Sequence, residues 1–218
     1  MKHAYLGFFV ISLLGFALAM PTSAANRASE VNEWNFDVYL NNKKVGKHFF
    51  RVSESGPLRQ VQSEARFKYT VLLIPAYRYE HIAAERWSGQ CLVAIDARTN
   101  ANGNRIQVSG EKTGSGFRIE REVAPVELPE CVMTFAYWNP DFLEQSRLLN
   151  PQTGEYVDVT VEEVGEEMLE VRGDKIPATR FRLTANEIDM TLWYSPDDEW
   201  LALESVAKGG HIIRYELS

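Results

Sequence analysis

The 218-residue sequence has few of the residues that signal catalysis or metal binding, and none of them stands in a recognised signature. It contains no GxSxG nucleophile elbow, no HExxH or HxH spacing and no CxxC pair. Beyond the N-terminal segment the histidines His48, His81 and His211 stand singly along the chain. We therefore expect no metal site and no cofactor, and the sequence identifies no catalytic residue.

The chain also lacks a cluster of lysines and arginines. It carries 23 basic against 30 acidic residues, which gives a formal net charge of −7. Nucleic acids and anionic lipid surfaces are bound by clustered basic side chains. This acidic, evenly distributed composition therefore predicts no nucleic-acid partner.

Long apolar runs are absent except at the N-terminus, where residues 4–19 are apolar. Lys2 precedes this run, and Pro21 and the small residues at 22–25 follow it, which is typical of a secretory signal peptide. The run is shorter than the roughly 20 residues that a membrane-spanning helix needs. We predict a signal peptide over residues 1–25, cleaved after Ala24 or Ala25. Residues 26–218 would form a single secreted or periplasmic β-rich domain without a stable membrane span.

Only two cysteines are present, Cys91 and Cys131, and export would place both in an oxidising compartment. We predict that they form a disulfide. On the chain-entropy model, a loop of about 40 residues closed in this way adds about 4 kcal/mol to the free energy of unfolding. The alternative is two separate buried thiols that pack as small apolar side chains.

Alternation of apolar and polar residues is the dominant pattern that the sequence does contain. Residues 34–40 and 43–52 alternate on either side of Asn41-Asn42, which predicts a β-hairpin, and residues 61–71 form the clearest half-buried strand. Further strands are expected at 77–87, 91–97, 105–110, 117–121, 156–164, 167–172, 178–185, 188–195, 200–208 and 212–217. Turns are expected at 99–104 and at Gly165. This spacing predicts a mainly β fold, either a single strongly curved antiparallel sheet or an open barrel.

The middle of the chain breaks this alternation. Residues 131–138 (CVMTFAYW) are apolar without a period of two and end before Asn139-Pro140, where a helix would have to stop. We predict one short central helix here, continued by a second turn over residues 141–145.

The same region combines large aromatic rings with amides and a hydroxyl, which suits the rim of a ligand pocket. The candidate ligand-binding residues are Tyr137, Trp138, Asn139, Asn150, Gln152 and Thr153. The alternative is a structural role, as a helix end packed on the sheet followed by an ordinary turn. The aromatic residues of the strands are likewise either core or the lining of a groove for an apolar guest.

Four blocks carry a resemblance to a known family: FAYWNP (135–140), LLNPQTGE (148–155), LWYSPDDEWLALES (192–205) and GGHIIRYEL (209–217). Together they resemble a family of uncharacterised secreted bacterial proteins known only as a domain of unknown function. The last two blocks also resemble a broader group of envelope proteins with a strongly curved sheet, distantly similar to the half-barrels that carry lipoproteins. The resemblance implies a fold and supplies no catalytic residues.

Three functional hypotheses follow. The first is a non-enzymatic binding or carrier module for a lipid-like or other apolar ligand, which predicts a cavity of about 300 Å³ or more on the concave face. The second is an interaction or accessory protein of the cell envelope, which predicts an exposed apolar patch or an unprotected edge strand. The third is a hydrolase-type enzyme, which would need His81 or His211 beside a buried carboxylate. The sequence favours a protein that is not an enzyme.

Overall fold

The computed structural model describes residues 31–71, 74–121, 124–207 and 209–218. The predicted signal peptide lies outside the described residues. Strands make up most of the described chain, as the alternation predicts. No helix in these four ranges has the length and apolarity needed to cross a membrane.

The strands belong to one 13-stranded antiparallel sheet and one separate pair, β9 and β10. Their bounds are β1 Val31–Leu40, β2 Lys43–Ser55, β3 Leu58–Val71, β4 Ile74–Ser88, β5 Cys91–Ala101, β6 Asn104–Lys112, β7 Phe117–Glu120, β8 Val126–Leu128, β9 Arg147–Leu149, β10 Tyr156–Asp158, β11 Thr160–Val171, β12 Asp174–Ala185, β13 Ile188–Tyr194, β14 Trp200–Ala207 and β15 His211–Leu217. The sheet order is β11-β12-β13-β14-β15-β1-β2-β3-β4-β5-β6-β7-β8. The predicted fold class, a mainly β protein with a single large antiparallel sheet, is confirmed.

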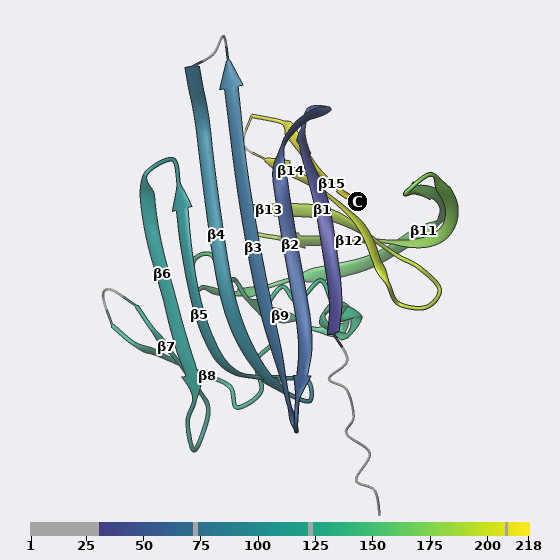
Figure 1. Cartoon of the computed structure of the whole chain (residues 1–218). Coiled ribbons are helices and arrows are strands. Elements are labelled where there is room, and N and C mark those ends of the chain that lie inside the picture. Colours follow the sequence, from purple (N-terminus) through teal and green to yellow (C-terminus); the bar gives the residue numbers. More distant parts are fainter. Residues whose placement is uncertain (1–30, 72–73, 122–123, 208) are drawn as a thin grey trace, which may run out of the picture.

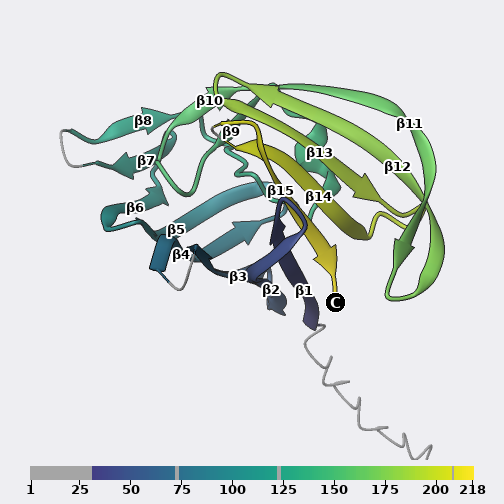
Figure 2. The ribbon, with the colours of Figure 1, turned by 90° about the horizontal axis from the view of Figure 1, so that it is seen from above.

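The sheet is strongly curved and is not closed, because β11 and β8 are its outer strands. Figure 2 shows the half made of β11–β15 folding over the half made of β1–β6, with β9, β10 and their connecting loops between them. Irregularities in register occur after Val38, Tyr69, Arg86, Glu163 and Trp193. Such bulges increase the local twist of a sheet and help it to bend.

The first hairpin has the turn that its two asparagines predict. Asn41 and Asn42 have φ values of 47° and 67°, the left-handed conformation that both central residues of a type I′ turn require. The turn also joins distant parts of the chain, because the Asn41 side chain accepts a hydrogen bond from the Ile212 amide at 2.9 Å. The start of β15 is thereby held beside the β1–β2 turn.

The predicted helix over residues 131–138 is wrong. This segment is irregular, and its backbone groups pair with neighbouring strands: Leu92 N donates to Val132 O at 2.9 Å, and Leu149 N donates to Met133 O at 2.8 Å. The predicted disulfide joins Cys131 to Cys91 at the start of β5. The carbonyls of Val132 and Met133 therefore have partners outside the segment, while residues 136–139 form local turns. Among the described residues the one helix is a short 3₁₀ turn, Pro140–Glu144, near the expected second turn.

Of two predicted turns, the first is shorter than expected and the second is wrong. Residues 99–101 continue β5, and the turn follows at Asn102-Gly103. Gly165 lies within the single strand β11, where it forms a bulge with a φ of 121°. A glycine inside an alternating segment marks either a turn or a bulge, and the sequence does not separate the two.

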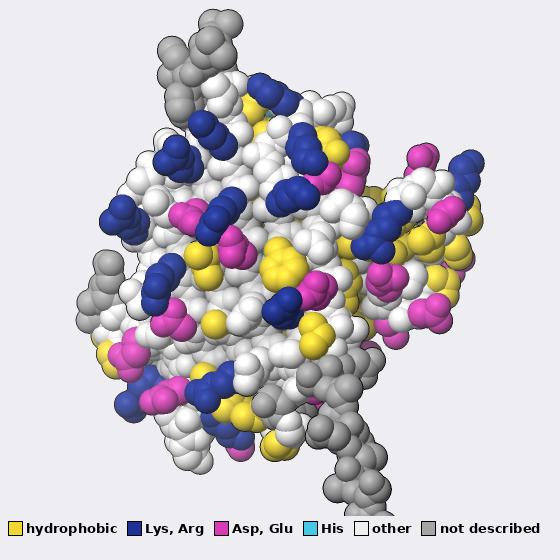
Figure 3. All heavy atoms as spheres, in the orientation of Figure 1, with side chains coloured by type: hydrophobic (Ala, Val, Ile, Leu, Met, Phe, Trp, Pro, Cys, Tyr) yellow, Lys and Arg dark blue, Asp and Glu magenta, His cyan; other side chains and the backbone are white. Residues whose placement is uncertain are grey.

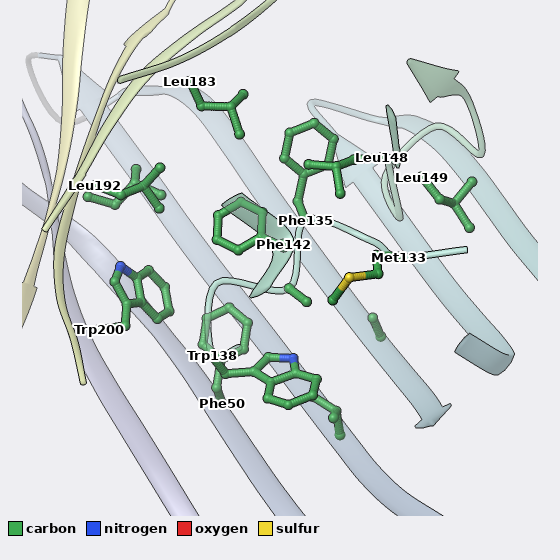
Figure 4. Packing of buried hydrophobic residues seen from close by; sticks show 14 of the residues in the cluster. Phe50, Met133, Phe135, Trp138, Phe142, Leu148, Leu149, Leu183, Leu192 and Trp200 are labelled. Carbon is green, nitrogen blue, oxygen red and sulfur yellow. The ribbon is translucent and has the colours of Figure 1, made fainter. Parts of the chain in front are cut away.

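The core fills the space between the two halves of the sheet. Phe36, Trp87, Phe142 and Trp200 are fully buried, and the rings of Phe36 and Trp200 lie 4.1 Å apart between centroids. Figure 4 shows Phe135, Trp138 and Phe142 of the central segment packed among residues of both halves. The outer face of β1–β6 carries Lys and Arg interspersed with Asp and Glu (Figure 3).

Candidate functional site

The interior contains a cavity of about 350 Å³. One wall is formed by β2, β3 and β4, and the facing wall by β13, β14 and β15. Residues 134–138 and 150–152 form a third wall, which we call the central wall. Ser63, Ala65 and Ala83 are small side chains at adjacent inward positions of β3 and β4, which leaves the space open.

His48 and Ser63 form a buried polar pair in the first wall. Nε2 of His48 lies 2.8 Å from Oγ of Ser63, while Nδ1 of His48 is buried without a hydrogen-bond partner among the described residues. Burial, together with the neighbouring His81, lowers the pKa of His48 to about 3. The imidazole is therefore uncharged at neutral pH and has one ring nitrogen available.

His81 forms a second polar group on the adjacent strand. Its Nδ1 lies 3.0 Å from Oγ1 of Thr99, and that hydroxyl donates to the carbonyl of Gln152 at 3.3 Å. Because the Thr99 hydrogen is directed to Gln152, Nδ1 of His81 is the donor in this pair, which leaves Nε2 as an acceptor. Burial lowers the pKa of His81 to about 4, so this ring is also uncharged at neutral pH.

Glu85 is a buried carboxyl on the same face of β4. Nε1 of Trp87 donates to it at 2.9 Å, and the Thr134 hydroxyl contacts it at 3.5 Å. Burial raises the pKa of Glu85 to about 7 despite these two hydrogen bonds. No Lys or Arg is among the described residues that line the cavity.

Besides Tyr77, three tyrosines, one from each wall, line the cavity. They are Tyr79 on β4, Tyr215 on β15 and Tyr137 in the central wall. Burial and the neighbouring phenols raise the pKa of Tyr79 and of Tyr215 far above the usual value, and burial does the same for Tyr137. None of the three hydroxyls makes a hydrogen bond to another described residue.

The structure brings four of the six predicted ligand-binding residues to the cavity, namely Tyr137, Trp138, Asn150 and Gln152. Their binding role stays a prediction. Asn139 is turned away, because its side chain caps the 3₁₀ turn and donates to Oε1 of Gln90 at 2.8 Å. Thr153 is exposed, and its hydroxyl accepts a hydrogen bond from the Glu155 amide within the same turn.

Sequence reasoning did not place His48, Ser63, Tyr79 and Glu85 in the site. A signal was present: residues 77, 79, 81, 83 and 85 share one face of β4, and most of them carry polar groups. A strand face that is both polar and buried indicates a hydrogen-bonded interior or a ligand site.

The polar groups do not complete a recognised catalytic arrangement within the described residues. Ser63 and His48 have the spacing of a nucleophile and its base, but no third group orients His48.

His81 and Glu85 share the cavity but are not bonded to each other. His81 is bonded to Thr99, and Glu85 accepts hydrogen bonds from Trp87 and Thr134. His211 is exposed and lies 2.7 Å from the Asn41 amide nitrogen. The described lining thus combines polar groups that are not Lys or Arg with apolar surface.

An open, strongly curved antiparallel sheet with a partly hollow interior defines a β-barrel-like protein. The chain belongs to the family described as domain of unknown function DUF6134, whose model matches residues 36–218. The expected resemblance to an uncharacterised family with a curved sheet is thereby confirmed. No curated protein matches the chain.

A similar structure has been solved, a beta-barrel-like protein of domain of unknown function DUF1849 from Brucella abortus. The similarity has a TM-score of 0.61 and covers 85% of this chain and 94% of that one. Sequence identity is 6%, so the comparison shows a shared fold.

Proposed function

We propose that the protein is a non-enzymatic binding or carrier module that holds a small lipid-like or otherwise apolar molecule between the two halves of its sheet. The cavity of about 350 Å³ carries this proposal. Ligand pockets typically measure about 300 to 1,000 Å³ and are lined mainly by apolar and aromatic side chains. At roughly 30 Å³ for each non-hydrogen atom, as in liquid water, the cavity has room for about a dozen such atoms.

The lining supports an apolar guest. Phe50, Phe67, Met190, Leu203 and Ile213 contribute hydrophobic surface from the first and the facing walls. The disulfide between Cys91 and Cys131 supports action in the periplasm or outside the cell, because disulfides persist in oxidising compartments.

The first experiment is native mass spectrometry of the mature protein purified from its own periplasm, followed by organic extraction. We expect a stoichiometric apolar molecule that is released into the organic phase. A mass equal to that of the polypeptide alone, with nothing in the extract, would contradict the proposal.

Two alanines on β4 provide a matched pair of variants. Ala83 is buried and lines the cavity, whereas Ala84 is exposed on the outer face of the same strand. The Ala83→Leu side chain should fill part of the cavity, so this variant should no longer bind the ligand. The Ala84→Leu variant should still bind the ligand. Far-UV circular dichroism of both variants checks that the sheet is intact. Retention of the ligand by a folded Ala83→Leu protein would place the ligand elsewhere.

One observation favours an interaction or accessory role in the envelope as a second candidate. The β11–β12 hairpin projects from the body of the protein, and β11 is an outer strand of the sheet (Figure 1). Val164 and Met168 on β11 are 39% and 59% exposed, and Figure 3 shows hydrophobic side chains beside acidic ones on this projection. A photo-crosslinking amino acid at position 168 should yield a discrete crosslinked species in the periplasm if this strand docks a partner.

A further inference from the structure

The charges of the cavity restrict the chemistry of its guest. The titratable groups of the described lining are two imidazoles, His48 and His81, the phenols, and the carboxyls of Glu85 and Glu187. The guanidinium of Arg59 lies over the Trp138 ring at 5.1 Å but lines a different hollow, with Asn139 and Pro140. No permanent cation of the described lining is thus available to compensate an anionic group inside the cavity.

An anionic head group would meet an unfavourable environment. Moving a carboxylate or phosphate from water into such a site is unfavourable unless an opposite charge or several donors replace the water. The imidazoles cannot readily supply that charge, because burial disfavours protonation of both and each ring would repel a charge on the other. An ammonium group is disfavoured at pH values below 7, because the buried Glu85 carboxyl is then protonated and offers it no negative charge.

Hydrogen-bond donors, by contrast, converge on the cavity from all three walls. The hydroxyls of Tyr79, Tyr137 and Tyr215 remain protonated and make no hydrogen bond to another described residue. A phenol that lines a cavity without a protein partner can donate to an acceptor oxygen of a ligand, which would take the place of water there. The buried Nδ1 of His48 is a further polar atom without a partner.

We propose that the ligand is an uncharged molecule with an apolar body and an acceptor oxygen, such as a ketone or ester carbonyl, that binds the tyrosine hydroxyls. This inference rests on the proposed function, because it assigns the class of guest to the same cavity. The aliphatic side chains of Met190, Leu203 and Ile213 would contact the apolar body.

A series of ten-carbon probes tests the inference. The mature protein is incubated with 2-decanone, decanoate, decylamine and decane at pH 6, where the acid and the amine are mainly charged and Glu85 is mainly protonated. Native mass spectrometry measures binding in pairwise competition. We expect 2-decanone to bind at least tenfold more tightly than decanoate and decylammonium. Binding of either ion as tight as that of 2-decanone overturns the inference and leaves the proposed function standing. Failure of all four probes to bind, with no molecule in the organic extract, overturns both.

Hydroxyl-deletion variants test the role of the phenols. Tyr79→Phe and Tyr215→Phe keep the ring and remove one donor each, so 2-decanone should bind about fivefold more weakly while decane is unaffected. Tyr39→Phe is the matched control, because this half-buried tyrosine packs under Arg214 and does not line the cavity. An equal loss of 2-decanone and decane binding would show that the hydroxyls act only on the fold, which overturns their assignment as ligand donors.

Discussion

Glu85 carries its carboxyl in an interior that disfavours a negative charge. Its pKa is about 7 in the folded protein, above the value of about 4.5 for an unperturbed glutamate. At pH values between 4.5 and 7, Glu85 keeps its proton in the folded protein and releases it in the unfolded chain. The contribution of Glu85 to stability is therefore fully present below pH 4.5 and is lost as the pH rises through 7.

Glu85→Gln tests this linkage, because glutamine keeps an acceptor for Trp87 and does not titrate. Between pH 5 and pH 8 the native protein should lose on the order of 3 kcal/mol of unfolding free energy relative to the variant. Urea unfolding at the two pH values measures this difference. Glu64→Gln, on the outer face of β3, is the control and should follow the native protein. Parallel pH profiles for the native protein and Glu85→Gln would mean that Glu85 is solvated.

His48 and His81 change the stability with pH in the direction opposite to Glu85. Their folded-state pKa values of about 3 and about 4 lie below the ordinary value of 6.5, so the unfolded chain binds protons that the folded protein excludes. Stability from these neutral rings is present above pH 6.5 and declines as the pH falls toward 4.

We predict that His81→Asn is less sensitive to acid than the native protein, by one to a few kcal/mol between pH 6.5 and pH 4.5. Thermal unfolding at several pH values in this range gives the comparison. His211→Asn changes an exposed imidazole and serves as the control. If the two variants lose stability equally on acidification, His81 is accessible to protons in the folded state.

At the scale of elements, the contact between β2 and β3 depends on a glycine. A Cβ at position 46 would lie 1.9 Å from the carbonyl oxygen of Arg66 and 2.9 Å from Cα of Phe67. Both atoms belong to the backbone of β3, so they cannot move aside as a flexible side chain would. The two strands would have to separate at the end of their ladder where Gly46 pairs with Phe67, two residues from His48.

Gly46→Ala should therefore lower the free energy of unfolding by about 3 kcal/mol or prevent folding. Gly114→Ala is the matched control, because a Cβ there meets nothing within 4 Å. Expression level and melting temperature separate the two variants. A Gly46→Ala protein that melts within a degree of Gly114→Ala would contradict the close approach of the strands.

Strands and turns could be predicted where residues close together in the sequence determine them. Asn41-Asn42 fixes a two-residue turn, and the alternation over residues 61–71 gives β3 with its buried face. The helix over 131–138 was mispredicted because an apolar run without alternation suits any fully buried segment, and its partners β5 and β9 lie far along the chain. The same limit applies to the site: alternation shows that His81 and Glu85 share a face but not that this face is concave.

At the scale of the whole molecule, the pairing of β15 with β1 joins the two ends of the described chain. Ser218 N donates to Asn35 O at 2.8 Å, and the register continues from Phe36 opposite Leu217. This pairing places the facing wall of the cavity opposite β2–β4. Nothing local in the sequence specifies it, because strand order depends on contacts that span the full chain.

The disulfide connects the sheet to the central wall. Cys131 precedes that wall and is bonded to Cys91 at the start of β5, and Leu92 N donates to Val132 O beside it. The bond therefore restricts the unfolded chain and also anchors the segment that closes the cavity.

Replacing both cysteines by alanine should lower the unfolding free energy by about 4 kcal/mol, the value expected for a loop of this length. Urea unfolding of the double variant and the native protein measures this loss. Hydrogen exchange should also accelerate at residues 132–138 more than in β3, because the central wall loses its anchor while the sheet keeps its ladder. Acceleration spread evenly over both regions would mean that the disulfide stabilises the fold globally without holding the wall. In that case the central wall would be held by the hydrogen bonds to Val132 and Met133 and by the packing of Trp138.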